Sequence, residues 1–138
     1  MLSRTADHLY WMSRYTERAE SLARLLDAHY RRSLLPHRPE ARQAHWQATL
    51  EALGVGLAYQ KRFDTLDGNA AFDFLATDRD HEGSIVSLLR YARENARAVR
   101  GTITAEMWET INSTYLDLKN ASNRDPGEFL DWVKYRSH

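Results

Sequence analysis

Hydrophobic positions recur with the period of an α-helix along most of the chain. At about 100° per residue, one stripe along the first 35 residues consists of His8, Trp11, Met12, Tyr15, Ala19, Leu22, Leu26 and Tyr30. No Gly or Pro interrupts these residues, whereas Pro36 and Pro39 follow and stop a helix because proline lacks the N–H donor. We expect a first helix of roughly 28 residues, about 42 Å long, that forms the spine of a helical bundle.

The same period returns in shorter segments, which we expect to be helices over residues 40–53, with a continuation over 57–63 after a glycine interruption, and over 69–76, 85–100 and 104–118. Ser84 and Thr104 can cap the last two, and Gly101 suits the position just after a helix. A final helix is expected to begin at Asp125, with Pro126 at its first position. The pattern predicts an all-α bundle of five or six helices in a single domain, residues 1–138.

The composition supports an all-α fold. Val and Ile together number 7, whereas Ala and Leu number 34, and helices favour Ala and Leu over β-branched residues. At 138 residues and 16.1 kDa, the chain has the length of one domain. Arginine outnumbers lysine 16 to 3, which supplies planar donors for carboxylate pairs but is also what a GC-rich genome would give.

Charge and motif content argue against several classes of function. Lys and Arg number 19 and Asp and Glu number 19, whereas nucleic-acid-binding proteins usually carry a basic excess. The sequence has no cysteine, no apolar run near the roughly 18 residues of a membrane span and no signal-peptide pattern. We therefore expect a cytoplasmic protein with neither nucleic-acid nor membrane partners. Glu-x-x-His, His-x-x-x-His and nucleotide-binding glycine motifs do not occur, so we expect no metal and no cofactor.

Two sets of arginine and glutamate side chains border the predicted apolar stripes. In the first helix, Arg14 and Arg18 are four residues apart with Glu17 beside them, so the three share one flank. In the helix over residues 85–100, Arg93 and Arg97 lie along the edge of the apolar face. Each set can be an inter-helix ion-pair network or an arginine pair that recognises an anion, and the sequence leaves both interpretations open.

Longer blocks of sequence surround both sets: LSRTAD, LYWM, RY and ERAE between residues 2 and 20, then SI at 84–85, ARENAR at 92–97, WE at 108–109 and Asn112. In order and content these blocks strongly resemble the bacterial alpha-E domain family, which is named for its helical content and its Glu-Arg motif. Family members commonly carry Gly where Ser13 stands and Asn-Pro where His81 and Glu82 stand.

The resemblance implies a functional setting. Alpha-E genes typically sit beside, or are fused to, genes for ATP-grasp proteins and transglutaminase-like proteins. ATP-grasp enzymes activate carboxylates as acyl phosphates and join them to amines, so the chain resembles a component of a peptide or amide ligase system. The resemblance carries over these motif residues as candidate substrate-binding residues, without assigning a catalytic one: Arg14, Glu17, Arg18, Glu20, Arg93, Glu94, Asn95, Arg97, Trp108, Glu109 and Asn112.

The resemblance also bears on length. The family is roughly twice as long as this chain and has a second helical half with a further Glu-Arg-type motif, so the chain resembles its N-terminal half. We expect either a fragment or a naturally short protein. Its exposed face would then be filled by a second copy of the chain, by a second helical half or by another partner.

Two functional hypotheses remain. In the first, the chain is an accessory subunit of an ATP-dependent amide-forming system, in which the arginines hold a carboxylate or acyl phosphate and Glu17 or Glu94 orients them or accepts an amine proton. In the second, the chain is a non-enzymatic helical interaction or oligomerisation module, and the Arg-Glu sets are buried structural salt bridges. Whether the chain is itself an enzyme stays open.

Overall fold

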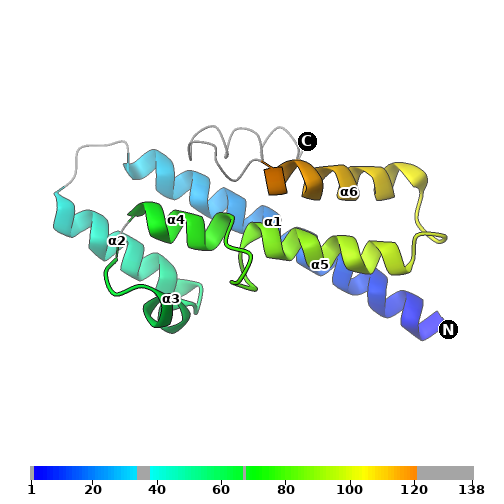
Figure 1. Cartoon of the computed structure of the whole chain (residues 1–138), viewed down its shortest axis with the longest axis horizontal. Coiled ribbons are helices and arrows are strands. Elements are labelled where there is room, and N and C mark those ends of the chain that lie inside the picture. Colours follow the sequence, from blue (N-terminus) through cyan, green and yellow to red (C-terminus); the bar gives the residue numbers. More distant parts are fainter. Residues whose placement is uncertain (1, 34–37, 67, 121–138) are drawn as a thin grey trace.

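The computed structural model of the chain is described over residues 2–33, 38–66 and 68–120, and it confirms the all-α class (Figure 1). No strand occurs in these residues. The helices, in chain order, are α1 (Leu2–Ser33), α2 (Pro39–Ala52), α3 (Gly56–Arg62), α4 (Gly68–Ala76), α5 (Ile85–Ala98) and α6 (Ala105–Asn120). The predicted helix from Asp125 onward lies outside the described residues.

The predicted spine helix is confirmed. Helix α1 has 32 residues and is therefore about 48 Å long at 1.5 Å per residue. It runs along most of the molecule, while α4 and α5 follow one another beside it and α6 returns along α5 (Figure 1). Helices α2 and α3 lie in the same half of the molecule as the C-terminal part of α1 (Figure 1). None of the described helices is long and apolar enough to span a membrane.

The packing of α1 against α5 is the most extensive contact between helices. Both helices carry alanine at buried positions: Ala19 and Ala23 in α1, and Ala92 and Ala96 in α5. Small side chains let two helix axes approach closely, because the distance between axes is set by the residues at the contact. The alanine content of the sequence is thus used where the two long helices meet.

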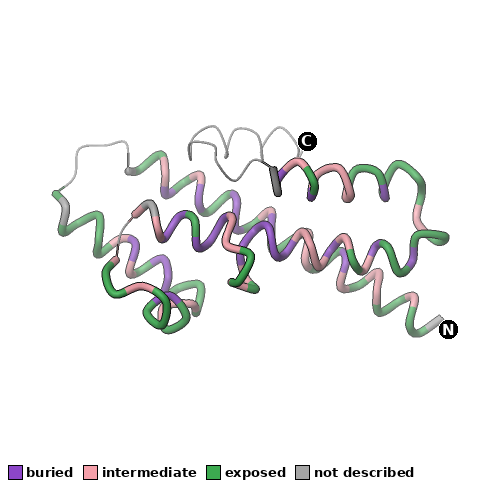
Figure 2. Tube along the Cα trace, in the orientation of Figure 1, coloured by how far each residue is buried: buried purple, intermediate pink, exposed green. Residues whose placement is uncertain are grey.

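Two apolar clusters fill the interior, and the buried residues lie on the inward sides of the helices (Figure 2). The larger cluster has members from every helix from α1 to α6, and its least exposed members include Leu26, Leu50, Phe74, Leu75 and Ile85. The smaller cluster joins α1, α5 and α6 through Met12, Ala96 and Trp108. Trp46 and Trp108 are both core residues.

Both predicted N-caps are confirmed. The Ser84 hydroxyl accepts a hydrogen bond from the Ser87 backbone N–H at 3.2 Å, and the Thr104 hydroxyl accepts one from Met107 at 3.1 Å. Each cap satisfies a backbone N–H that a helix start leaves without an intrahelical partner.

The predicted role of Gly101 as the residue that ends α5 is wrong. Helix α5 ends at Ala98 with Val99 as its C-cap. The Val99 carbonyl then accepts hydrogen bonds from the N–H groups of Thr102 and Ile103 at 2.8 and 3.2 Å. A turn held by backbone hydrogen bonds therefore ends the helix, and Gly101 is not in the left-handed region.

Among the described residues, the glycine in the left-handed region is Gly54, which follows α2 with φ 73°. Its N–H donates to the Glu51 carbonyl, and the Val55 N–H donates to the Leu50 carbonyl, both at 3.0 Å. This pair of bonds is the Schellman arrangement, in which glycine after the C-cap avoids the steric cost of a side chain. Gly54 thereby fixes the turn from α2 into α3.

His29 joins α1 to α2 and is buried. Its ring lies 4.2 Å from the His45 ring and 3.7 Å from the Trp46 ring, centroid to centroid, and its Nδ1 lies 3.3 Å from the Thr49 hydroxyl oxygen. Burial, reinforced by the nearby His45 and Arg32, lowers the pKa of His29 to about 4. The imidazole is therefore neutral at pH 7.

Replacement of Ala92 by leucine tests the close packing of α1 on α5. Ala92 is completely buried, so Ala92→Leu should overpack the interface and lower the free energy of unfolding by about 1–3 kcal/mol. Ala98, on the same helix, is exposed, and Ala98→Leu should change stability by less than about 0.5 kcal/mol. Urea denaturation followed by circular dichroism measures both. Equal effects of the two changes would contradict the proposed packing.

The pH dependence of stability tests the neutral state of His29. Its pKa is lower in the folded than in the unfolded state, so the unfolded state binds the proton more tightly and stability falls as pH drops below about 6.5. From pH 7 to pH 5 this histidine should cost about 2 kcal/mol of stability. His29→Phe, which keeps an aromatic ring, should remove that part of the slope in urea denaturation at pH 5, 6 and 7. An unchanged slope in the variant would show that His29 is not responsible.

Candidate functional site

An open pocket of about 670 Å³ lies on one flank of α1. Its walls come from the middle of α1, the turn between α2 and α3, and the segment from α4 through the following loop into α5. The volume lies within the range of sites that hold small molecules. The pocket therefore combines three segments that are far apart in the sequence.

The polar wall of the pocket is formed by α1. Arg14, Glu17, Arg18 and Ser21 line it and are all exposed. Their spacing of three or four residues places them on neighbouring turns of one helix flank, as the sequence predicts. The guanidinium carbon of Arg18 lies 5.9 Å from the centroid of the Tyr15 ring.

Arg14 and Arg18 take part in no ion pair among the described residues. The pairs found there are Glu20 with Arg24 at 3.5 Å, Asp27 with Arg31 at 3.3 Å, and Arg62 with Asp78. Two cationic groups thus line an open pocket, and no carboxylate of the described residues pairs with either of them. This arrangement suits the binding of an anion, because a guanidinium group pairs with carboxylate or phosphate through two parallel hydrogen bonds.

The remaining surface of the pocket is largely apolar. Tyr15 and Tyr91 pack against each other with ring centroids 5.3 Å apart, and both line the pocket. The aliphatic lining comes from all three segments and consists of Leu22, Leu25, Leu53, Val55, Leu75 and Leu88. A ligand in this pocket would therefore meet both charge and hydrophobic surface.

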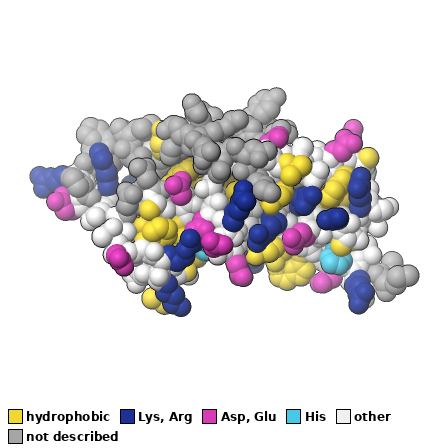
Figure 3. Space-filling model, viewed as in Figure 1, with side chains coloured by type: hydrophobic (Ala, Val, Ile, Leu, Met, Phe, Trp, Pro, Cys, Tyr) yellow, Lys and Arg dark blue, Asp and Glu magenta, His cyan; other side chains and the backbone are white. Residues whose placement is uncertain are grey.

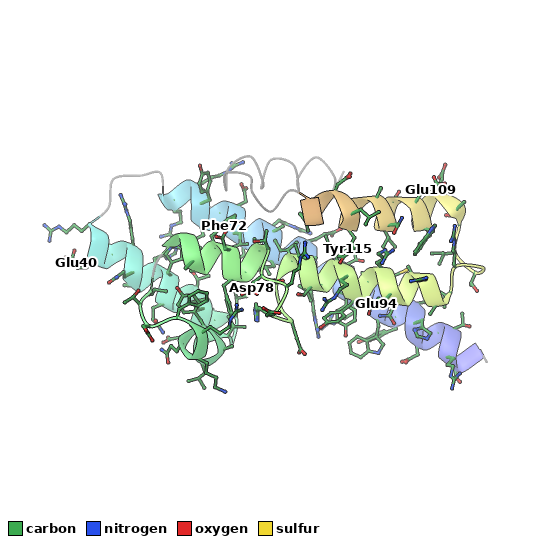
Figure 4. The ribbon with its side chains drawn as sticks, in the orientation of Figure 1. Glu40, Phe72, Asp78, Glu94, Glu109 and Tyr115 are labelled. Atoms are coloured by element: carbon green, nitrogen blue, oxygen red, sulfur yellow. The ribbon has the colours of Figure 1, made fainter. Side chains whose placement is uncertain are left out.

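The loop between α4 and α5 supplies His81, Glu82 and Gly83 to the pocket. It is held by Asp78 (labelled in Figure 4), whose carboxylate pairs with Arg62 and accepts a hydrogen bond from the Asp80 N–H at 2.9 Å. The backbone carbonyl oxygen of Asp78 also accepts a hydrogen bond from the Ser84 hydroxyl at 2.7 Å. The loop is consequently tied to α3 and to the first turn of α5.

His81, a residue of this loop, is partly buried. Its ring stacks on Phe74 at 4.0 Å between centroids, and its Nε2 atom is buried without a hydrogen-bond partner among the described residues. A Cβ atom at Gly83 would lie 3.0 Å from that nitrogen, so glycine leaves room for the ring. Burial lowers the pKa of His81, although the nearby Asp78 and Glu82 act to raise it.

The second predicted set of residues lies elsewhere. The Nε–H of Arg93 donates to the Asn112 side-chain oxygen at 2.6 Å, and the guanidinium carbon of Arg93 lies 5.4 Å from the Tyr115 ring centroid and 6.0 Å from that of Trp108. Figure 4 shows Tyr115 between α5 and α6. Arg93, Trp108 and Asn112 thus hold α6 against α5.

The other candidate residues are divided between a second interface and the surface. The side-chain oxygen of Asn95 lies 2.9 Å from His8 Nδ1, and this contact links α5 to α1. The Asn95 side-chain amide also donates to the Tyr91 carbonyl at 2.8 Å. Glu94, Arg97 and Glu109 are exposed, and none of them lines the pocket. Glu20 is paired with Arg24. The structure therefore brings together Arg14, Glu17 and Arg18 but does not join them to the set on α5.

Sequence reasoning missed the other walls of the pocket. Leu53, Val55, His81 and Glu82 lie between 35 and 64 residues from Arg18 along the chain, and only the fold brings them to the same pocket. No group of three or more potential metal ligands occurs in the part of the chain that the structure describes.

These features define a class: an all-helical domain with a Glu-Arg pair on a helix that lines a pocket. The chain belongs to the Alpha-E family, described as "a predicted alpha-helical domain with a conserved ER motif", and the model of that family matches residues 1–138. Glu17-Arg18 is the one Glu-Arg dipeptide in the sequence. The family resemblance drawn from the sequence is confirmed.

Two curated relatives are similar to the chain, an uncharacterized protein of Mycobacterium bovis and an uncharacterized protein of Mycobacterium tuberculosis. Each is 27% identical over 139 residues, a match that covers 92% of this chain and 16% of the relative. The chain thus spans about a sixth of the length of these relatives. No solved structure matches the chain.

A pair of arginine substitutions on α5 tests the separation of structural from exposed positions. Arg93→Ala removes the bond to Asn112 and the ring contacts, so it should lower the free energy of unfolding by about 1–3 kcal/mol. Arg97→Ala should change it by less than about 0.5 kcal/mol, because Arg97 is exposed. Thermal and urea denaturation measure both variants. A variant at Arg93 as stable as the unaltered protein would refute the structural role.

Proposed function

We propose that this Alpha-E domain handles an anionic group, a carboxylate or an acyl phosphate, as a component of an ATP-grasp-associated peptide or amide ligase system. The observation that carries the proposal is the pocket in which Arg14 and Arg18 line one wall without an ion pair in the described chain. The ligase setting is what the family's association with ATP-grasp and transglutaminase-like proteins suggests. These proteins are the partners we propose.

The chemistry of the polar wall supports anion binding. Arg14 and Arg18 lie four residues apart on one helix, so their guanidinium groups can approach one anion from adjacent turns. Glu17 lines the same pocket and can orient an arginine or accept a proton from an incoming amine. The domain would therefore hold the acyl component, while an ATP-grasp partner would supply the activation.

The alternative function is a helical interaction module in which the Arg-Glu sets are buried salt bridges. Arg14, Glu17 and Arg18 are exposed, and no ion pair of the described residues joins either arginine set to a glutamate of the sets. Arg93 does have a structural role, but its partner is Asn112. These observations favour the anion-binding function for the set on α1.

Titration of the purified protein tests the proposal. N-acetylglycine and acetyl phosphate provide a carboxylate and an acyl phosphate, and isothermal titration calorimetry measures their dissociation constants. Arg14→Ala and Arg18→Ala should each weaken binding about tenfold or more, because each removes a charged hydrogen-bond donor worth roughly 1.5–3 kcal/mol. Melting temperatures of these variants should stay close to that of the unaltered protein, since both side chains are exposed.

The matched control is Arg24→Ala. Arg24 lies on the same helix and is exposed, but it pairs with Glu20 and does not line the pocket. It should leave both dissociation constants unchanged. Absence of binding by both probes, or equal weakening by all three substitutions, would exclude a specific anion site at Arg14 and Arg18.

A further inference from the structure

We infer that the pocket recognises a carboxylate whose adjacent carbon carries an apolar side chain, the chemistry of a free apolar amino acid or of a peptide C-terminus. This inference rests on the proposed anion-binding function and names the class of its ligand. The observation behind it is that hydrophobic side chains from three chain segments converge on the pocket that Arg14 and Arg18 line.

Two leucines show that the apolar surface is open to a ligand. Leu25 is 38% exposed and Leu53 is 36% exposed, and both line the pocket from different segments. They adjoin the buried residues Leu22, Leu75 and Leu88 of the same pocket. An apolar side chain placed here would remove hydrocarbon surface from water on both molecules, which is favourable in proportion to the area covered.

The order of residues along α1 matches this ligand. Arg18, Leu22 and Leu25 follow one another at spacings of four and three, so cation and hydrocarbon occupy successive turns of one flank, roughly 5–6 Å apart. The carboxylate and the side chain of such a ligand leave the same carbon and lie closer together than this, but the long Arg18 side chain can lie along the apolar surface and bring its guanidinium group nearer to the leucines. One ligand of this kind can therefore reach both surfaces at once.

The first experiment compares three small probes by calorimetry with the full chain. N-acetylleucine should bind about tenfold more tightly than N-acetylglycine, because the leucine side chain is covered in part by the pocket. N-acetylleucinamide, which lacks the carboxylate, should lose at least tenfold relative to N-acetylleucine. Free leucine and the tripeptide Ala-Ala-Leu then distinguish the two sources: tighter binding of the tripeptide identifies a peptide C-terminus, and tighter binding of free leucine identifies an amino acid.

The second experiment locates the apolar contact. Leu25→Ala and Leu53→Ala should each reduce the preference for N-acetylleucine over N-acetylglycine while leaving the affinity for N-acetylglycine unchanged. Leu57→Ala is the matched control, because Leu57 is 75% exposed and does not line the pocket, and it should keep the full preference. All three positions are exposed, so the variants should fold, which melting curves check.

The outcomes separate this inference from the function on which it rests. Equal affinity for N-acetylleucine and N-acetylglycine, with both lost in Arg18→Ala, would overturn the apolar specificity and leave the anion site standing. Equal affinity for N-acetylleucine and its amide would overturn the carboxylate requirement and the proposed function with it. An unchanged preference in both Leu25→Ala and Leu53→Ala would place the apolar contact elsewhere and overturn this assignment.

Discussion

The close packing of α1 on α5 is the constraint on which the other features depend. Buried alanines on both helices allow it, and α6 is then attached to the outer side of α5 through Arg93 and Asn112. With one stripe of α1 committed to this interface, the flank that carries Arg14 and Arg18 is left at the edge of the contact. The pocket lies along that flank, between α1, the turn that joins α2 to α3, and the segment from α4 into α5.

Several arginines of the described residues lie beside aromatic rings, and Arg62 does so while it also pairs with Asp78. Guanidinium groups lie within 6.0 Å of ring centroids at four tyrosine or tryptophan positions on α1, α5 and α6, and Arg62 contacts Phe63 in the same way. The planar guanidinium suits this geometry better than a lysine ammonium group. Basic and acidic side chains are accordingly interspersed over the described part of the face in Figure 3.

Local sequence patterns predicted the helices well. They could not predict the site fully, because the site depends on which distant segments lie next to one another in the fold. Helical period placed the spine helix, and side-chain chemistry placed the caps at Ser84 and Thr104. The Arg-Glu pattern, however, occurs in two different structural settings. Arg93 meets Asn112 on a helix that the pattern could not position, whereas Arg18 borders a pocket closed by Leu53 and His81. Periodicity identifies the flank of a helix but not the neighbour of that flank.

Gly54 has a consequence for how ligand selectivity can change. It does not line the pocket, yet its left-handed backbone fixes the turn that carries Leu53 and Val55, which do. No atom lies within 4 Å of a Cβ placed there, so another residue would fit sterically and pay only about 1–2 kcal/mol of backbone strain. Relaxing that strain would reshape the pocket wall, and an evolutionary change of preferred ligand could therefore begin at a residue that contacts neither ligand nor core.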